Sequence, residues 1–210
     1  MDLMFFILIL PFFIYWCINE KIGLQLCVTA LISIWAILVY THLSEYLPFN
    51  FDIRLFIVAV IFCGYLFLHK KIEKLISKGG FRAFMITAAA FSFIMILYRP
   101  DFRFVIPAGL FLGLGIGYCL NKRYVGFKSS NVLQRTGPAK YLTLLARFLL
   151  GMAVLALIVL RVEVIIEQIS KSQNVFLYCF LCYALIGFWV SIASPWIFIK
   201  LRLAGIEEKQ

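Results

Sequence analysis

Long, nearly uncharged apolar runs are the feature that most restricts the fold of this chain. Hydrophobic residues make up 64% of its 210 residues and charged residues only 14%, against roughly a quarter in an average soluble domain. A soluble domain of this composition cannot cover its surface with polar groups. The apolar runs are continuous rather than alternating, which argues against a β-barrel. The sequence therefore predicts an all-α polytopic membrane helix bundle, with residues 1–210 forming a single integral membrane domain.

A membrane-spanning helix needs about 20 mostly apolar residues. The first candidate is expected to be retained rather than cleaved as a signal peptide, because Asp2 follows Met1 and no small-residue cleavage site follows the apolar core. Seven segments qualify as spans, several of them short: Leu3–Ile18, Ile22–His42, Ile53–Leu68, Ala83–Tyr98, Phe104–Leu120, Tyr141–Leu160 and Val175–Ile199.

The positive charges alternate between the two sides of these spans. Of the 20 lysines and arginines, 15 fall on one side, mainly in the 69–82 loop and the 121–147 stretch, and five fall on the other. Loops rich in lysine and arginine stay in the cytoplasm. The sequence thus predicts the N-terminus outside and the C-terminus in the cytoplasm. The net charge of +10 then reflects orientation and contact with anionic lipid, with no nucleic-acid partner.

Few polar side chains lie inside the predicted spans. Gln25, Thr29 and Ser33 recur every four residues and so share one helix face. This face is either a seam of interhelical hydrogen bonds, which we favour, or the lining of a ligand groove.

Glycines mark the fifth predicted span. Gly109, Gly113 and Gly117 recur every four residues and follow Pro107. Small residues at this spacing let another helix backbone approach closely, so we interpret them as helix-packing residues.

The residues that could bind a metal or carry redox chemistry lack the neighbours that such a site needs. Glu163 and Glu167 share a helix face but have no further acidic or histidine neighbour, and the C-x-x-C motif at 179–182 lies in an apolar run. The predicted topology places His42 and His69 on opposite faces of a hydrocarbon layer about 30 Å thick. The sequence therefore predicts no metal site and no cofactor.

Several segments carry a family resemblance. The N-terminal ones are 5–11 and 15–24, and the later ones are 108–113, 117–118, 122–127, Arg147–Gly151, Tyr183–Val190 and Pro195–Phe198. Together they resemble a bacterial membrane phosphatase of the type 2 phosphatidic acid phosphatase family. Residues 1–48 resemble its N-terminal spans, and residues 53–205 resemble its post-catalytic spans and long C-terminal extension. The resemblance implies a protein of the bacterial cytoplasmic membrane.

The catalytic pattern of that family is missing here. The pattern runs Lys, six residues, Arg-Pro; then Pro-Ser-Gly-His; then Ser-Arg, five residues, His, three residues, Asp. Aligned on Pro48, the arginine and lysine positions hold Leu47 and Tyr40; aligned on Arg99-Pro100, the lysine position holds Ser92. In neither register does the Ser-Arg-His-Asp run follow. Without the basic residues that hold phosphate and the histidine that attacks it, the resemblance implies a pseudoenzyme with no catalytic residues.

The leading hypothesis is therefore a non-catalytic membrane protein that binds a lipid or acts as a partner subunit. The ligand is expected to be an anionic phospholipid or an isoprenoid phosphate, and the partner another membrane protein. The candidate lipid- and headgroup-binding residues are Arg54, Arg99, Arg103, Gln25, Thr29 and Ser33.

Two other functions stay open: a membrane lipid-metabolism enzyme, either a phosphatase or an acyltransferase, with an unrecognised site, and a lipid transporter or flippase. Residues 129–137 resemble the Ser/Asn/Arg/Gly loop of the acyl-phosphate-dependent glycerol-3-phosphate acyltransferases, which also have seven spans. A lipid transporter or flippase is supported only by the polar face of the second span, since no inverted repeat is visible. Acyl transfer to glycerol 3-phosphate would indicate the first, and flipping of a labelled lipid in proteoliposomes the second.

Overall fold

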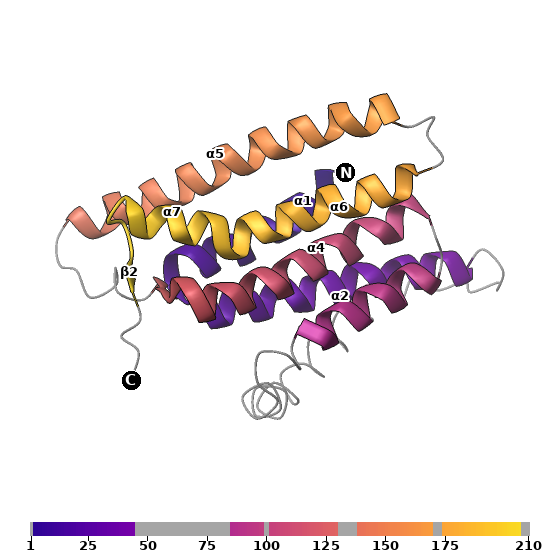
Figure 1. The fold of residues 1–210 in the computed structure, drawn as a ribbon, viewed down its shortest axis with the longest axis horizontal. Coiled ribbons are helices and arrows are strands. Elements are labelled where there is room, and N and C mark those ends of the chain that lie inside the picture. Colours follow the sequence, from indigo (N-terminus) through magenta and orange to yellow (C-terminus); the bar gives the residue numbers. More distant parts are fainter. Residues whose placement is uncertain (1, 45–84, 99–100, 130–137, 170–173, 207–210) are drawn as a thin grey trace.

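The structure is a computed structural model that describes residues 2–44, 85–98, 101–129, 138–169 and 174–206. Its described helices run along the long axis of the molecule (Figure 1). The elements, in chain order, are α1 (Asp2–Phe13), η1 (Ile14–Ile18), α2 (Glu20–Ser44), the helix Met85–Tyr98, α4 (Phe102–Leu120), η2 (Asn121–Val125), β1 (Phe127–Lys128), α5 (Pro138–Ile169), α6 (Val175–Phe188), η4 (Trp189–Ala193), α7 (Ser194–Lys200) and β2 (Gly205–Ile206).

The expectation of an all-α membrane protein is confirmed. Within the described residues, four helices are long and apolar enough to cross a membrane, and Leu8–Ile18 and Met85–Tyr98 are shorter apolar helices. The predicted span Ile53–Leu68 lies outside the described residues, so the total of seven spans and their orientation stay predictions. The four long helices are Glu20–Leu43, Phe102–Val125, Lys140–Gln168 and Val175–Lys200.

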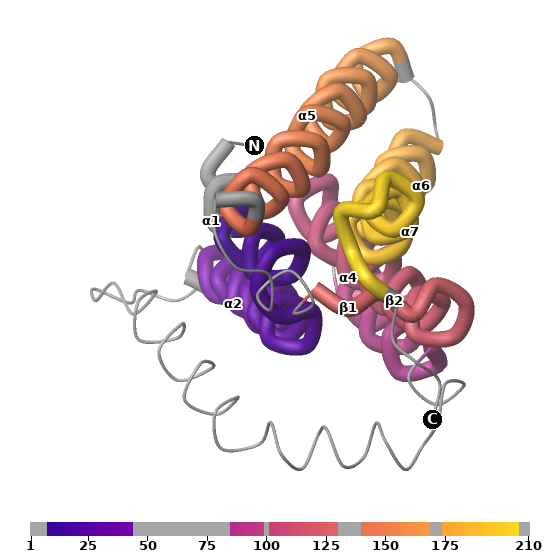
Figure 2. The backbone as a smooth tube through the Cα atoms, turned by 90° about the vertical axis from the view of Figure 1, so that its left-hand side faces the viewer, coloured from indigo at the N-terminus to yellow at the C-terminus, as the bar shows by residue number. Residues whose placement is uncertain are grey.

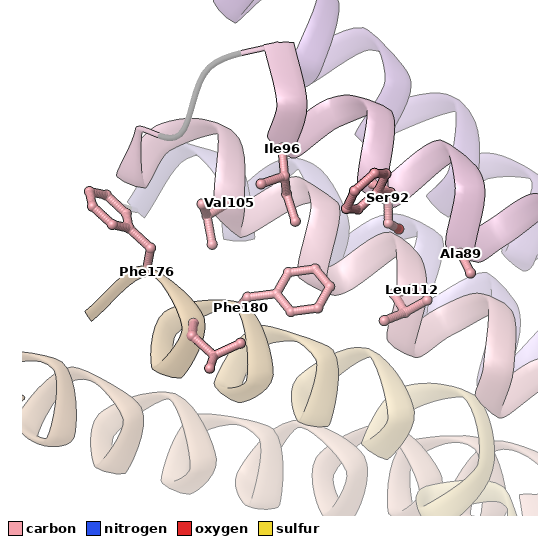
Figure 3. A pocket seen from close by; sticks show the side chains of 9 residues that line it. Ala89, Ser92, Ile96, Val105, Leu112, Phe176 and Phe180 are labelled. Atoms are coloured by element: carbon pink, nitrogen blue, oxygen red, sulfur yellow. The ribbon is translucent and has the colours of Figure 1, made fainter. Parts of the chain in front are cut away.

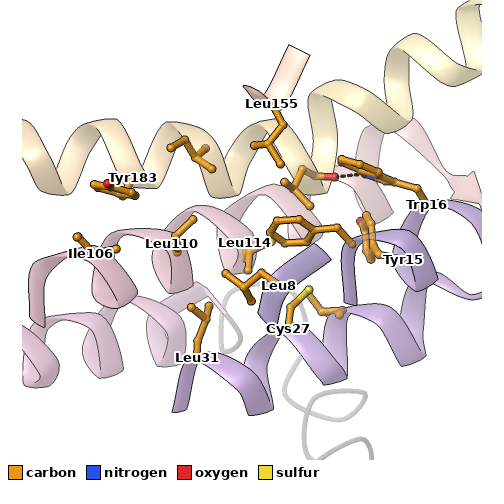
Figure 4. Packing of buried hydrophobic residues seen from close by; sticks show 14 of the residues in the cluster. Leu8, Tyr15, Trp16, Cys27, Leu31, Ile106, Leu110, Leu114, Leu155 and Tyr183 are labelled. Atoms are coloured by element: carbon orange, nitrogen blue, oxygen red, sulfur yellow. Dashed lines mark hydrogen bonds between the residues drawn. The ribbon is translucent and has the colours of Figure 1, made fainter. Parts of the chain in front are cut away.

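Helix α4 is the centre of the bundle. In its apolar stretch 72% of the residues are buried, against 17% for α5. Seen down the bundle, α1 and α2 lie on one side of α4 and α6 on the other, with α5 at the edge (Figure 2). Figure 4 shows side chains from α1, α2, α4, α5 and α6 meeting in one hydrophobic core, including Leu31, Leu110 and Leu155.

Helix α5 is longer than the predicted span Tyr141–Leu160. Its 32 residues span about 48 Å at 1.5 Å per residue, more than a hydrocarbon layer of about 30 Å. Hydropathy ends the span at Arg161, but arginine and glutamate are good helix formers, so the helix continues through Glu163 and Glu167.

Three short π-helical segments, η1, η2 and η4, lie at the same end of the bundle as β1 and β2. Asn19 follows η1, and Gly126 follows η2. Asn19 begins α2, because its side-chain oxygen accepts hydrogen bonds from the N–H groups of Lys21 and Ile22 at 2.9 and 3.2 Å. Gly126 ends η2 in the left-handed region, with φ 63°, which glycine adopts without steric cost.

A two-residue antiparallel ladder closes this end of the molecule. Phe127 is paired with Ile206 and Lys128 with Gly205. The sequence did not predict this ladder, because two residues are too few to show the alternation that marks a strand.

Candidate functional site

Pro195 removes one backbone donor from the end of η4. Proline has no N–H, so it cannot donate to the oxygen of Ser191, four residues earlier, or to that of Val190, five residues earlier. Two side chains from η1 bond to these carbonyls: the Tyr15 hydroxyl donates to Ser191 O at 2.9 Å, and the Trp16 Nε1 donates to Val190 O at 2.9 Å, the bond drawn in Figure 4. These two carbonyls thus join η1 to η4, and Val190 O also accepts from the Ser194 hydroxyl at 3.2 Å.

Asn121 adds η2 to this junction. Its Nδ2 donates to Ser191 O at 2.8 Å and to the Tyr15 hydroxyl at 3.1 Å, and its Oδ1 accepts from Phe127 N at 3.3 Å. Asn121 is only 3% exposed, so these bonds compensate its loss of contact with water. The three π-helical segments therefore meet in one buried hydrogen-bond network.

Arg147 is the second centre of the same end, and it is completely buried. Its guanidinium donates to the carbonyl oxygens of Leu203 (Nε 3.0 Å, Nη2 2.6 Å), Trp16 (Nη1 3.0 Å) and Ser129 (Nη1 3.1 Å). The guanidinium carbon also lies 5.7 Å from the centre of the Phe127 ring. One side chain of α5 thus holds η1, the segment after β1 and the segment before β2.

Glu20, at the first turn of α2, lies beside this arginine-centred network. Its Oε2 accepts from the Ser129 hydroxyl at 2.6 Å and from Ser129 N at 3.2 Å, and its Oε1 lies 3.8 Å from Lys122 Nζ. Ser129 therefore connects Glu20 to Arg147, because its carbonyl oxygen accepts from that guanidinium.

The hydrogen bonds of this polar network connect the ends of several helices. Ser129 is fully buried and its hydroxyl is bonded to Glu20, so the first residue of the acyltransferase-like loop is not presented to a substrate. Residues 130–137 lie outside the described residues. No group of three or more His, Cys, Asp and Glu side chains able to hold a metal is found among the described residues.

An apolar groove lies on the bundle between the helix Met85–Tyr98, α4 and α6 (Figure 3). Its volume is about 430 Å³, and its walls include Ile96, Val105, Leu112 and Phe180. The hydroxyl of Ser92, on the same wall, donates to the Ala108 carbonyl at 3.0 Å. This volume falls within the roughly 300–1,000 Å³ of small-molecule sites, and the lining suits a hydrocarbon group.

The groove reaches the surface of the bundle. Two of its lining residues, Phe93 and Leu177, are 62% and 57% exposed. In a membrane-spanning helix bundle, exposed side chains of this kind face lipid. The groove is therefore accessible to a lipid chain from the side of the bundle.

The predicted headgroup residues are not gathered on one surface. Thr29 and Ser33 are buried in the bundle, and the Thr29 hydroxyl donates to the Gln25 carbonyl of its own helix at 2.8 Å. Arg103 is exposed in the first turn of α4. Arg54 and Arg99 lie outside the described residues, so headgroup binding by these side chains stays a prediction.

The glycines of α4 lie against α6. A Cβ at Gly109 would come within 2.6 Å of the Phe180 carbonyl oxygen, and one at Gly113 would overlap the Ala184 carbonyl oxygen. On the facing helix, a Cβ at Gly187 would come within 2.5 Å of the Leu110 carbonyl oxygen. The two backbones therefore approach as closely as glycine allows.

Gly117, in the same row, faces the end of α6. A Cβ there would overlap the Ser191 hydroxyl. That hydroxyl donates to Gly187 O at 2.8 Å, so the glycine row continues up to the polar junction.

The buried charges were not predicted from the sequence. Arg147 was counted with the cytoplasmic 121–147 stretch, yet it is fully buried, and Glu20 is 8% exposed. The position of Arg147 inside an apolar run was the feature of the sequence that could have indicated its burial. A lone arginine there needs internal acceptors because it cannot lose its charge.

The remaining singled-out residues lie apart from the polar network. The His42 ring packs edge-on against Tyr98, with centroids 6.4 Å apart. Cys179 is buried and Cys182 is partly buried, and both are free thiols. His69 lies outside the described residues.

The C-terminal part of the chain matches a known protein family. Residues 105–206 match the family described as PAP2 superfamily phosphatase, transmembrane extension. No curated protein and no solved structure matches the chain. The matched segment runs from α4 to β2 and contains Asn121, Ser129, Arg147 and Ser191. On the basis of this match and the helical fold, the chain is an integral membrane protein whose residues 105–206 are similar to the transmembrane extension of the PAP2 superfamily phosphatases.

Proposed function

We propose that this chain is a non-catalytic relative of the PAP2 superfamily phosphatases that holds a membrane lipid by its hydrocarbon chain. The apolar groove between the helix Met85–Tyr98, α4 and α6 is the observation that carries the proposal. A lipid held there from the surrounding bilayer keeps its headgroup at the membrane surface. Location in a bacterial cytoplasmic membrane is part of the same proposal.

The chemistry of the groove supports a hydrocarbon ligand. The Ser92 hydroxyl already donates to a backbone carbonyl, and aromatic and aliphatic side chains such as Phe180 and Leu112 form the walls. A phosphate placed among these groups would lose its hydration without gaining charged partners, which is strongly unfavourable. A saturated or isoprenoid chain has no such penalty.

The organisation of the polar groups supports binding without turnover. Arg147, a cation that could otherwise hold a phosphate, is buried with its guanidinium donating to three backbone carbonyls. The lysine, arginine and histidine pattern of the related phosphatases is missing from the sequence. Without an activated nucleophile, only a small fraction of normal catalysis would remain.

Photo-crosslinking tests the groove directly. A phospholipid with a diazirine in its acyl chain, reconstituted with the protein, should label residues of the helix Met85–Tyr98, α4 and α6. Ala89 is exposed and lines the groove, so Ala89→Trp should fill part of the groove and reduce labelling several-fold. Ala90, its exposed neighbour, lies outside the lining, and Ala90→Trp is the matched control. Equal labelling of both variants would contradict the proposal.

Phosphate release tests the non-catalytic part. Purified protein, free of contaminating phosphatases, should release no phosphate from phosphatidate or from isoprenoid pyrophosphate. Turnover that disappears in His42→Ala would contradict the proposal and would identify an active site at the end of α2.

A further inference from the structure

Exposed positive charges are concentrated at one end of the bundle. This basic end, defined here by Lys21, Arg123, Lys128, Lys200 and Arg202, includes the starts of α2 and β1 and the ends of η2 and α7. Among the described residues of this end, Glu20 is the acidic side chain, and it is 8% exposed. Over the described residues, the surface of the basic end therefore carries a large excess of positive charge.

The opposite end of the bundle has a mixed charge. There the described charged residues are Asp101 and Arg103 at the start of α4, and Arg161, Glu163 and Glu167 near the end of α5. Negative charges outnumber positive ones in this set. Within the part of the chain that the structure describes, the bundle is thus electrostatically polarised along its long axis, and of these two ends the basic one is complementary to an anionic surface.

Aromatic side chains accompany two of the exposed cations. Lys200 Nζ lies 3.8 Å from the centre of the Trp196 ring, and the Arg123 guanidinium carbon lies 5.4 Å from the Tyr124 ring centre. Trp196 and Tyr124 are 47% and 69% exposed. Tryptophan and tyrosine with a neighbouring lysine or arginine favour the boundary between acyl chains and headgroups, where the ring is partly buried and the cation meets phosphate.

The two cation–aromatic pairs lie on neighbouring elements. Lys200 and Trp196 belong to α7, and Arg123 and Tyr124 belong to η2, which is in contact with α7. Both elements lie at the end of the bundle marked by β2 (Figures 1 and 2). The two pairs therefore lie at the same end of the bundle, on elements that touch each other.

We propose that the basic end is a docking surface for anionic phospholipid headgroups, with Lys200–Trp196 and Arg123–Tyr124 as its anchoring pairs. The surface recognises the charge of the lipid headgroup, whereas the apolar groove recognises the hydrocarbon chain of a lipid. The two sites are separate, so this proposal does not depend on lipid binding in the groove.

Charge-removal variants test this proposal. The affinity of the purified protein for phosphatidylglycerol and phosphatidylcholine is measured by native mass spectrometry at low salt. Wild-type protein should prefer phosphatidylglycerol. Each cation near an anionic surface contributes about 1 kcal/mol, so Lys200→Gln and Arg123→Gln should each reduce this preference about five-fold. The matched control is Arg161→Gln, which removes an exposed cation from the opposite end.

Two outcomes would overturn the proposal. One is an equal reduction in Arg161→Gln and Lys200→Gln, since the preference would then follow net charge rather than this surface. The other is an unchanged preference in both basic-end variants, which would leave an acidic protein partner to explain the charge. Thermal unfolding of all three variants in detergent should match that of the wild type, which confirms that they fold without reference to the groove.

Discussion

Arg147 and Leu203 are joined by two hydrogen bonds from one guanidinium, Nε to O at 3.0 Å and Nη2 to O at 2.6 Å. They fix the segment after α7 to the side of α5. The same guanidinium reaches Trp16 and Ser129, so segments far apart in the chain depend on one planar group with five donors.

Loss of this guanidinium should destabilise the protein strongly. Arg147→Met leaves the carbonyls of Leu203, Trp16 and Ser129 buried without these donors, and we expect a loss of about 3–5 kcal/mol in the free energy of unfolding. Arg147→Lys should recover little, because an ammonium cannot reproduce the planar fork. Thermal unfolding in detergent measures both. Arg123→Lys, at an exposed position, is the control, and an equal effect there would contradict the interpretation.

The role assigned to Pro195 predicts energetic coupling to Tyr15. Tyr15→Phe removes the hydroxyl that donates to Ser191 O and should cost about 1–2 kcal/mol. In Pro195→Ala the restored N–H can donate to that carbonyl, so the same tyrosine change should cost about 0.5–1 kcal/mol less. A double-mutant cycle in unfolding experiments gives the coupling. Additive effects would mean that the missing N–H of the proline does not affect this acceptor. Tyr124→Phe, at an exposed ring, should be nearly neutral.

The contact of α4 with α6 should not tolerate a side chain at Gly113. A Cβ there overlaps the Ala184 carbonyl oxygen, and backbone cannot move aside as a flexible side chain can. We expect Gly113→Val to cost at least about 2 kcal/mol, measured by thermal unfolding and by the yield of folded protein. The control Ala156→Val adds bulk at an exposed position of α5. Wild-type stability in Gly113→Val would show that the helices do not pack this closely.

Orientation is tested by labelling. In a variant without the six native cysteines, a cysteine at the exposed Tyr124 position should react only with reagents that reach the cytoplasm. A cysteine at Gln168, exposed near the other end of α5, should react only from outside. These outcomes follow from the excess of lysine and arginine on one side. The reverse pattern would mean that the basic end is external.

The approximate positions of the described helices were predictable from hydropathy. Helical hydrogen bonds are local, and an apolar run of sufficient length leaves the backbone no other way to satisfy its polar groups in a bilayer. The glycine row of α4 likewise predicted close packing, although not that α6 is its partner. Hydropathy ended the sixth predicted span at Leu160, short of the end of α5, because it detects the membrane boundary rather than the end of the helix.

The polar network was decided by tertiary structure. The sequence shows Arg147 in an apolar run and Pro195 in another, but their effects depend on groups far away: Trp16, Ser129 and Leu203 for the arginine, and Tyr15 and Asn121 for the carbonyls near the proline. Burial removes water as a competing partner, so each donor must find an acceptor on another segment. Sequence by itself thus determined an all-helical membrane chain with a basic side. Only the packing of its helices decided which polar groups are consumed in holding the bundle together and where an apolar groove remains open.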